Sequence, residues 1–196
     1  MRIIAGIHRT RQIEAPEGLL TRPMTDRVRE NLFNLLGDTV VNATVLDLFC
    51  GSGALGIEAL SRGATRVTFV DTDLAAVSVV ETNCKRLGLE KQARILRRDV
   101  LRPGPWIRPV GTKDYALIFI DPPYKMSAEP GGQAQLAAMV EAIAGLECVA
   151  RGALAMIRVE RNTRITLPWA GFEFSDQRSY GTTTLCLMTY LGKEAE

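Results

Sequence analysis

The sequence VLDLFCGSGALGIEALSRGA at residues 45–64 decides the fold. Its first residues form a short apolar run that is typical of a buried strand, and Gly51 and Gly53 follow this run in a turn. Residues 54–61 are rich in helix-forming side chains, and Gly63 follows them where a helix would end. The segment therefore predicts a strand, a glycine loop and a helix in direct succession, which is the opening unit of a doubly wound α/β fold.

Strands and helices continue to alternate after this segment. The sequence predicts a strand at residues 66–70, a helix at 74–87, strands at 94–96 and 115–120, a helix at 133–144 and a strand at 153–159. This alternation favours a parallel sheet with helices on both faces. The strand-like runs at residues 171–178 and 183–191 are joined through Ser-Tyr-Gly, which predicts an antiparallel hairpin at the sheet edge. We expect an α/β fold with a mostly parallel, seven-stranded, Rossmann-like sheet.

The residues before this alternation form a small N-terminal extension. Residues 2–15 predict one or two short strands, and residues 25–36 predict a helix with Thr25 as its N-cap. The sequence shows no internal repeat, low-complexity tract or linker. We therefore expect one domain over residues 1–196, with an extension over residues 1–40 and the Rossmann-like core over residues 41–196.

Composition and cysteine usage exclude several classes of protein. The chain has 196 residues, 46% of them hydrophobic and 23% charged, which is ordinary for a globular protein. No apolar run approaches the roughly 18 residues of a membrane span, and the apolar stretch at residues 3–7 is shorter than the ~7 to 15 residues of a signal-peptide core. The 4 cysteines are scattered and His8 is the one histidine, so neither a zinc site nor a disulfide scaffold is supported. We expect a cytoplasmic protein without a metal or a membrane partner.

The charge of the chain leaves the kind of partner open. The formal net charge of +2 comes from 24 basic and 22 acidic residues. Arginines gather in two regions, near the N-terminus and late in the chain: Arg2, Arg9, Arg11, Arg22, Arg27 and Arg29, and Arg151, Arg158, Arg161 and Arg164. Guanidinium groups suit phosphates because they donate two hydrogen bonds side by side. Charge alone favours an RNA-binding surface and a merely solvated surface equally.

The glycine loop predicts a nucleotide-like ligand. Gly51, Gly53 and Gly56 follow the pattern G-x-G-x-x-G, and Asp71 ends the next strand twenty positions after Gly51, where a carboxylate would accept hydrogen bonds from ribose hydroxyls. S-adenosylmethionine has a ribose too, but it carries a sulfonium and an ammonium in place of phosphates. Asp47, four residues before Gly51, therefore favours S-adenosylmethionine over a dinucleotide.

Two further residues near this loop have alternative interpretations. Asp99 lies where the third strand should end and would bind the adenine amine of the ligand; the alternative is a solvated loop carboxylate beside two arginines. For Asp47, the alternative is a hydrogen bond that caps the helix or the strand end. Cys50 is interpreted as a small filler and not as a nucleophile.

The tetrapeptide Asp121-Pro122-Pro123-Tyr124 follows a wholly apolar strand and is the most informative motif. The prolines stiffen the backbone, and the carbonyl of Pro122 can accept a hydrogen bond from a ligand. Asp121 supplies a second acceptor, and Tyr124 supplies an aromatic face that can stack on a base. Together they would orient an exocyclic amine of guanine or adenine toward a methyl donor, so we interpret these residues as catalytic.

These motifs resemble those of the bacterial RsmD-like methyltransferases. The resemblance rests on the glycine-loop segment at residues 45–64, on D-P-P-Y, on RPMTDRVRE at residues 22–30 and on the closing Tyr180-Gly181, and it extends over nearly the whole chain. The glycine loop is shared with most class I methyltransferases and D-P-P-Y with amino-methylating enzymes, whereas the R-P-x-T-D-R-V-R-E stretch points to this family. The resemblance implies S-adenosylmethionine-dependent methylation of the N2 amine of one guanine in 16S ribosomal RNA.

The resemblance also implies roles for individual residues. Asp47, Gly51 and Gly53 would line the methionine part of S-adenosylmethionine, Asp71 its ribose and Asp99 its adenine, while Arg22 and Thr25 would close over the cofactor. The target guanine would be held by Asp121, Pro122 and Tyr124. The RNA would be faced by Arg9, Arg11, Arg27 and Arg29. Arg27 or Arg29 can equally pair with Asp26 or Glu30 on the same helix. The family implies a monomer that acts on 16S RNA within an assembling or assembled small subunit.

Three other functions compete with this one. A DNA adenine-N6 methyltransferase would use the same D-P-P-Y corner, but it usually needs a larger recognition insertion than the loop at residues 101–114. A nicotinamide-dependent dehydrogenase would use the glycine loop, but it leaves Asp47 and D-P-P-Y without a role. A non-catalytic RNA-binding assembly factor is disfavoured by the intact Asp121 and Tyr124.

Overall fold

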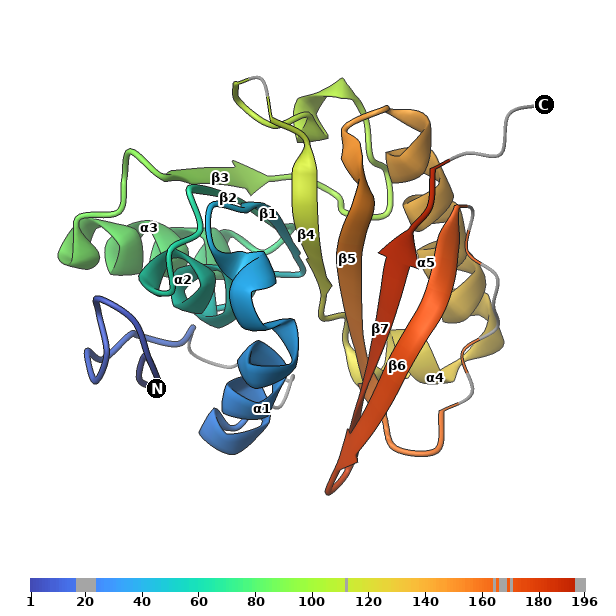
Figure 1. Ribbon diagram of the computed structural model, residues 1–196, viewed down its shortest axis with the longest axis horizontal. Coiled ribbons are helices and arrows are strands. Elements are labelled where there is room, and N and C mark those ends of the chain that lie inside the picture. Colours follow the sequence, from blue (N-terminus) through green and yellow to red (C-terminus); the bar gives the residue numbers. More distant parts are fainter. Residues whose placement is uncertain (17–23, 112, 164, 166–168, 170, 193–196) are drawn as a thin grey trace. The chain divides into compact units, whose positions relative to one another are not determined.

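The computed structural model describes residues 1–16, 24–111, 113–163, 165, 169 and 171–192, and Figure 1 labels its helices and strands. The chain forms two compact units, Met1–Asp99 and Val100–Glu196. The boundary falls directly after Asp99, so the expected extension over residues 1–40 lies in the same unit as the glycine loop. The single domain over residues 1–196 stays a prediction.

The first unit is built on three parallel strands in the order β3-β2-β1. Thr44 lies opposite Arg66 in the pairing of the first two strands, and Leu48 lies opposite Val70. The first strand is buried along its whole length, as is usual inside a parallel sheet. The elements of this unit are α1 (Asp26–Leu36), the 3-10 helix η1 (Gly37–Val40), β1 (Thr44–Leu48), α2 (Ala54–Ser61), β2 (Arg66–Asp71), α3 (Leu74–Leu87) and β3 (Ala93–Arg97).

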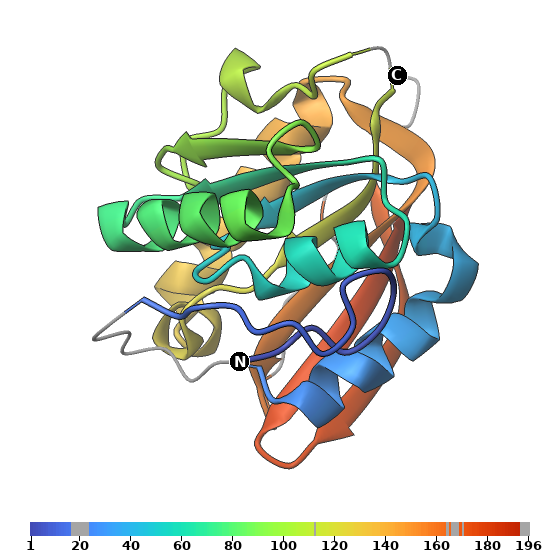
Figure 2. The same ribbon diagram turned by 90° about the vertical axis from the view of Figure 1, so that its left-hand side faces the viewer.

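Helix α2 lies very close to β2. A Cβ atom on Gly56 would lie 2.3 Å from Cε1 of Phe69 and 2.8 Å from Cγ1 of Val67, so only glycine allows this approach. The N-terminal segment runs along another side of the same helix, as Figure 2 shows, and α2 is buried from Leu55 through Ser61. Its buried position brings the glycine loop, which directly precedes it, to the end of β1.

The second unit combines a parallel pair of strands with an antiparallel hairpin. Its strand order is β4-β5-β7-β6, in which β4 is parallel to β5 while β7 is antiparallel to both of its neighbours. The elements are the 3-10 helix η2 (Pro105–Ile107), β4 (Tyr115–Ile120), α4 (Tyr124–Ala128), α5 (Pro130–Gly145), β5 (Val149–Glu160), β6 (Phe172–Tyr180) and β7 (Thr183–Tyr190). Among the described residues the two units contribute seven strands, and the predicted α/β class with a mostly parallel sheet and a C-terminal antiparallel hairpin is confirmed.

Most predicted elements are confirmed, and some have the expected bounds. The helices at residues 54–61 and 74–87 and the strand at residues 115–120 begin and end where the sequence predicts. Thr25 caps α1, because its hydroxyl accepts a hydrogen bond from the backbone N–H of Val28 at 3.4 Å. The strand predicted at residues 153–159 is longer, because it begins at Val149. In the described part of the chain, no helix is long and apolar enough to span a membrane.

The prediction of strands at residues 2–15 is wrong. This segment contains only one isolated bridge, between Arg2 and Gln12, and it turns through Gly6 and Thr10, whose φ angles are 82° and 70°. The N–H groups of Ile4 and Ala5 donate to the carboxylate of Glu58, at 2.8 and 3.0 Å. The segment is therefore held by a side chain of α2 and not by a neighbouring strand.

Gly56→Ala is expected to lower the free energy of unfolding by about 1 to 3 kcal/mol, because the new methyl group forces α2 away from the buried ring of Phe69. Urea unfolding monitored by circular dichroism measures this loss. Gly131→Ala is the matched control, since a Cβ atom at Gly131 meets nothing within 4 Å. The control should leave the stability unchanged or raise it by up to about 1 kcal/mol. Equal stability of Gly56→Ala and the wild type would contradict the close approach.

Candidate functional site

The glycine loop turns the chain sharply between β1 and α2. Gly53 has a φ angle of 75°, and a Cβ atom there would also lie 3.0 Å from Cγ2 of Val80. Its N–H donates to the carbonyl of Cys50 at 2.7 Å, which closes the turn, and α2 begins at the next residue. Gly51 also has a positive φ angle, 52°. The backbone at this loop can therefore approach a ligand closely.

Asp71 lies beside this loop, as predicted. Its Oδ2 accepts a hydrogen bond from the N–H of Gly51 at 2.9 Å, and its Oδ1 accepts one from the N–H of Asp73 at 3.0 Å. A carboxylate has about four acceptor positions, so these two bonds leave capacity for hydroxyl groups of a ligand. The structure thus brings together Gly51 and Asp71, which lie twenty positions apart in the sequence.

Asp47 is buried, with 1% of its surface exposed. Its Oδ2 accepts a hydrogen bond from the N–H of Gly56 at 2.9 Å, in the first turn of α2. This is the helix-capping geometry that the sequence offered as the alternative interpretation. The carboxylate stabilises the loop, and its contact with the methionine part of the cofactor stays a prediction.

The other predicted cofactor residues are placed only in part. Asp99 is exposed and follows β3 by two residues, so it lies after the carboxyl end of that strand as expected. The hydroxyl of Thr25 caps α1. Arg22 lies outside the described residues. The closure of Arg22 and Thr25 over a cofactor therefore stays a prediction.

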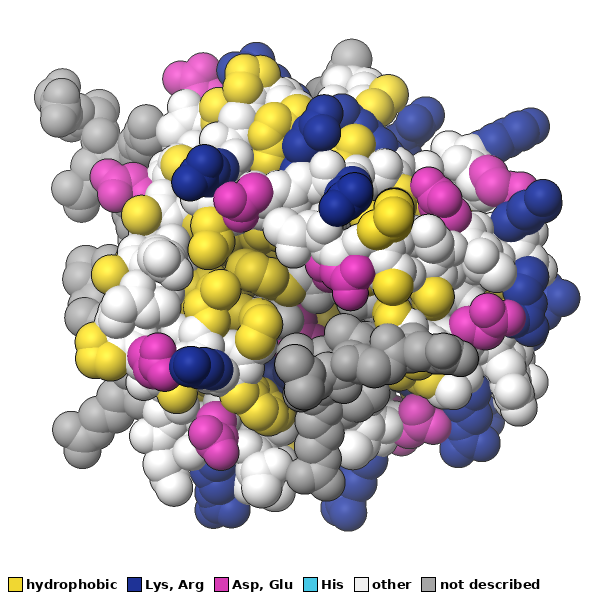
Figure 3. All heavy atoms as spheres, turned by 180° about the vertical axis from the view of Figure 1, so that it is seen from behind, with side chains coloured by type: hydrophobic (Ala, Val, Ile, Leu, Met, Phe, Trp, Pro, Cys, Tyr) yellow, Lys and Arg dark blue, Asp and Glu magenta, His cyan; other side chains and the backbone are white. Residues whose placement is uncertain are grey.

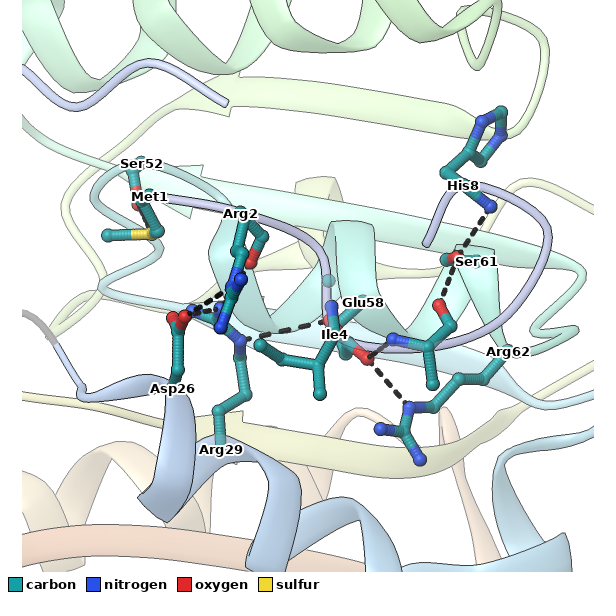
Figure 4. Close-up of polar contacts among 12 residues, drawn as sticks. Met1, Arg2, Ile4, His8, Asp26, Arg29, Ser52, Glu58, Ser61 and Arg62 are labelled. Carbon is teal, nitrogen blue, oxygen red and sulfur yellow. Dashed lines mark hydrogen bonds and ion pairs between the residues drawn. The ribbon is translucent and has the colours of Figure 1, made fainter. Parts of the chain in front are cut away.

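Arg29 does not face solvent, and its predicted place on an RNA-binding surface is corrected. Its side chain is 1% exposed, pairs with Asp26 at 3.0 Å and lies 3.8 Å from a carboxylate oxygen of Glu58, as Figure 4 shows. It also donates to the backbone carbonyl of Arg2. Burial lowers the pKa of Arg29, while the carboxylates of Glu58 and Asp26 oppose this shift. The guanidinium group is used inside the protein, where phosphate cannot reach it.

The remaining predicted RNA-facing arginines, Arg9, Arg11 and Arg27, are exposed. Charge on the surface is mixed: on the face shown in Figure 3, Lys and Arg side chains lie between Asp and Glu side chains. This agrees with the small net charge of +2. RNA binding by these three residues stays a prediction.

The D-P-P-Y corner lies at the carboxyl end of β4. Asp121 directly follows the strand, and its side chain is 17% exposed and paired with Nε of Arg158 on β5. The guanidinium of Arg158 also lies over the ring of Tyr124, 5.1 Å from its centroid. The hydroxyl of Tyr124 is hydrogen-bonded to Oγ1 of Thr183 on β7, at 2.6 Å. A carboxylate and an aromatic ring are thus held together by residues of two neighbouring strands.

The electrostatics of the corner depend on Arg158. Burial raises the pKa of Asp121, and the positive charge and hydrogen bond of Arg158 oppose this rise. The side chain of Arg158 is itself only 6% exposed, so its charge is poorly screened by water. Arg158 therefore favours the ionised form of Asp121.

Sequence reasoning missed the roles of Arg158 and Thr183. The sequence places Arg158 among the late arginines that suit phosphates, yet it is the one charged residue within the apolar run at residues 153–159. A charge inside a buried strand needs a partner, and this was the signal that was available. Thr183 had no such signal, because threonine is common in strands.

A shallow pocket of about 450 Å³ lies next to the corner, where α4 meets α5. Pro123, Lys125, Met126 and Gln135 are among its lining residues. Its size falls in the range of small-molecule sites. Pro123, the third residue of D-P-P-Y, connects the pocket to the corner.

The cysteines do not contribute a nucleophile. All four are buried, and burial raises the pKa of Cys84 to about 12 and those of Cys148 and Cys186 to about 11. The pKa of Cys50, beside the glycine loop, is also raised, by burial and then by the carboxylates of Asp47 and Asp71. These thiols are protonated at neutral pH, so Cys50 acts as a small filler. In the described part of the chain, no group of three or more His, Cys, Asp or Glu residues is placed to hold a metal ion.

The strand order within each unit and the glycine loop after β1 define a Rossmann-like fold, and similarity to a solved methyltransferase structure places the protein in the class I methyltransferases. The solved structure of a methyltransferase candidate from Escherichia coli, yhhF, is similar to this chain with a TM-score of 0.81 and 30% sequence identity. The match covers 98% of this chain and 99% of that one.

The family model described as "Conserved hypothetical protein 95" matches residues 1–189. The chain belongs to this family, whose members include the RsmD-like methyltransferases. YlbH of Bacillus subtilis (strain 168), named as an rRNA methyltransferase candidate, is 45% identical over 127 residues, 64% of this chain and 67% of that protein. Ribosomal RNA small subunit methyltransferase D of Escherichia coli (strain K12) is 39% identical over 125 residues, 64% of this chain and 61% of that protein. The matched part thus spans less than two thirds of the length of the Escherichia coli relative.

Arg158→Met is expected to lower the free energy of unfolding at pH 8 by about 1 to 3 kcal/mol, because it leaves the partly buried carboxylate of Asp121 without its counter-charge. Without Arg158 the pKa of Asp121 rises further. The variant is therefore most stable below the pKa of an unfolded aspartate, and it loses stability as the pH rises through the folded-state pKa. Urea unfolding between about pH 5 and pH 8 measures this dependence.

The double variant Asp121→Asn/Arg158→Met is the control for this pH dependence. It lacks the titrating carboxylate, so the additional loss at high pH should be absent. A loss in Arg158→Met that does not change with pH would contradict the electrostatic role of Arg158.

Proposed function

We propose that this protein transfers the methyl group of S-adenosylmethionine to the exocyclic N2 amine of a guanine in 16S ribosomal RNA. The observation that carries the proposal is the D-P-P-Y corner, where one buried arginine holds the Asp121 carboxylate and the Tyr124 ring together. An acceptor beside a flat aromatic face fits a base that carries an amino group. The names of the family relatives as rRNA methyltransferases support an RNA substrate.

The residues of the first unit fit S-adenosylmethionine. Asp71 has acceptor capacity for ribose hydroxyls, and the tight turn at Gly51 and Gly53 allows a ligand to approach the backbone. Two carboxylates, Asp47 and Asp71, adjoin the loop and disfavour a pyrophosphate there. When bound, S-adenosylmethionine supplies a methyl group that is activated by its positively charged sulfur.

The residues of the corner would orient the acceptor nitrogen. The carboxylate of Asp121 and the carbonyl of Pro122 accept the two hydrogens of the amine, while Tyr124 stacks on the base. Methyl transfer from the bound cofactor would place a positive charge on the amine nitrogen, which would then lose one proton to solvent. An ionised Asp121 would stabilise this charge, and Arg158 favours the ionised form because its positive charge and hydrogen bond oppose the rise in the pKa of Asp121 that burial causes.

The target base must be accessible for this reaction. A guanine stacked inside a duplex cannot present its amine in line with a methyl donor, so the target is an unpaired or flipped base. The proposal includes 16S RNA within an assembling or assembled small subunit as the partner, a monomeric enzyme and a cytoplasmic location, where buried thiols stay reduced.

S-adenosylmethionine with a labelled methyl group, offered with 16S RNA, assembled small subunits and duplex DNA, tests the function by nucleoside analysis of the labelled product. We expect N2-methylguanosine from ribosomal RNA. Asp121→Asn should lower kcat by roughly 10²- to 10³-fold while the affinity for the cofactor stays within a few-fold. N6-methyladenine in DNA would instead show a DNA methyltransferase, and bound cofactor without any labelled product would favour a non-catalytic RNA-binding factor.

Asp71→Asn is expected to weaken binding of S-adenosylhomocysteine by roughly 10- to 100-fold, because the charged acceptor for the ribose hydroxyls is lost. Isothermal titration calorimetry measures this change. Asp73→Asn is the matched control: it removes the same charge two residues away, and asparagine caps α3 as well as aspartate does. Equal affinities of the two variants for S-adenosylhomocysteine would contradict the binding of the ribose by Asp71.

A further inference from the structure

A single buried side chain connects the N-terminal segment to the glycine loop. Asn83, on α3, is 1% exposed. Its Oδ1 accepts from the N–H of Glu14 at 2.8 Å, and its Nδ2 donates to the carbonyl of Glu14 at 3.0 Å and to the carbonyl of Ser52 at 3.2 Å. One amide thus bonds both backbone groups of Glu14 and one backbone group of the loop.

Burying the polar amide of Asn83 would lower the stability of the fold unless these hydrogen bonds were made. It lies on the buried face of α3 between Val80 and Leu87, where an apolar residue would pack without a polar group to satisfy. Asparagine is also a weaker helix former than leucine. Reversing the amide would set its oxygen against two carbonyl oxygens, so the backbone partners determine its orientation. The side chain is suited to joining the two backbone segments.

Backbone hydrogen bonds join the two ends of the N-terminal segment, residues 1–13, which precedes Glu14. The N–H of Ile3 donates to the carbonyl of Arg11 at 2.9 Å, and the N–H of Ile13 donates to the carbonyl of Met1 at 2.9 Å. Glu58 and Ser61 of α2 hold the segment from the other side, as Figure 4 shows. A displacement of Glu14 is therefore transmitted to the whole segment, which carries Arg9 and Arg11 on its surface.

The other end of the connection is the cofactor loop. Ser52 lies between Gly51 and Gly53, and its hydroxyl lies 3.6 Å from Sδ of Met1. Figure 4 shows these two side chains next to each other. The N–H of Gly51 is bonded to Asp71, so a ligand that binds Asp71 acts on the same short loop.

We propose that Asn83 is a positioning residue that couples the glycine loop to the N-terminal segment, so that cofactor binding and RNA binding strengthen each other. The inference rests on the proposed function, because it needs a cofactor at the loop and RNA at the segment. A ligand that orders the loop also orders the carbonyl of Ser52, and Asn83 passes this constraint to Glu14. By linkage, RNA that orders the segment tightens the cofactor to the same extent.

Amide hydrogen exchange measured by NMR, with and without saturating S-adenosylhomocysteine, tests this coupling. The amides to follow are those of Ile3, Thr10 and Ile13, which are bonded within the segment and not to Asn83. In the wild type, S-adenosylhomocysteine should slow their exchange by at least about 5-fold. In Asn83→Ala the effect should fall below about 2-fold. Asn83→Asp keeps the acceptor and loses both donors, so it should show the same loss, and it serves as the second variant where Asn83→Ala folds poorly.

Ser61→Ala is the matched control. It removes the bonds of Ser61 Oγ to the N–H of His8 and the carbonyl of Ala5, so it loosens the same segment without touching the glycine loop. In Ser61→Ala the amides of Ile3, Thr10 and Ile13 should exchange faster than in the wild type. S-adenosylhomocysteine should still slow their exchange by the same factor as in the wild type. The affinity for 16S RNA, measured by filter binding, should rise by a similar factor with S-adenosylhomocysteine in the wild type and in Ser61→Ala, but not in Asn83→Ala.

The inference alone would be overturned if S-adenosylhomocysteine bound without a response of the wild-type segment, or if both Asn83 variants showed the full response. Failure of the wild type to bind S-adenosylhomocysteine in calorimetry would overturn the proposed function, and the inference with it. Loss of the response in Ser61→Ala as well would show that any loosening of the segment abolishes it, which would contradict a specific role of Asn83.

Discussion

The close approach of α2 to β2 is the constraint on which the first unit depends. It is possible because Gly56 has no side chain to meet Phe69. With α2 in this position, the N–H of Gly56 reaches Asp47, and the turn at Gly53 ends at the start of the helix. Another side of the helix presents Glu58 to the N-terminal segment. The glycine loop and the segment are therefore both positioned by one helix.

The second unit uses a buried cation in a comparable way. Arg158 pairs with Asp121 and lies over Tyr124, so one side chain contacts both the carboxylate and the ring. Buried charges are expensive unless they are paired and hydrogen-bonded, which makes such an arrangement sensitive to the loss of either partner. In this corner the same bond that stabilises the fold also prepares the group proposed for catalysis.

Local patterns explain why much of the fold was predictable. Apolar runs predicted the buried strands β1 and β4, and helical spacing predicted α3 with Gly88 as its C-cap, which has a φ angle of 70°. The N-terminal segment was mispredicted because its backbone bonds to side chains of α2, and strand propensity contains no information about such partners. The site was predictable only in part. The spacing of Gly51 and Asp71 indicated that they lie close together, and they are hydrogen-bonded. The burial of Arg29 was not predictable, because it depends on ion pairs with Asp26 and Glu58.

The sequence by itself determined the order of strands and helices, the glycine loop, the carboxylate after β2 and the D-P-P-Y corner after β4. These features depend on backbone preferences and side-chain types within a few residues of each other. Only the tertiary structure decided which polar groups meet across long separations, such as Arg158 with Asp121, 37 positions apart, and Asn83 with Glu14, 69 positions apart. Such pairs form because packing brings distant segments to one place, where a buried polar side chain such as Arg158 or Asn83 must find whichever partner lies there.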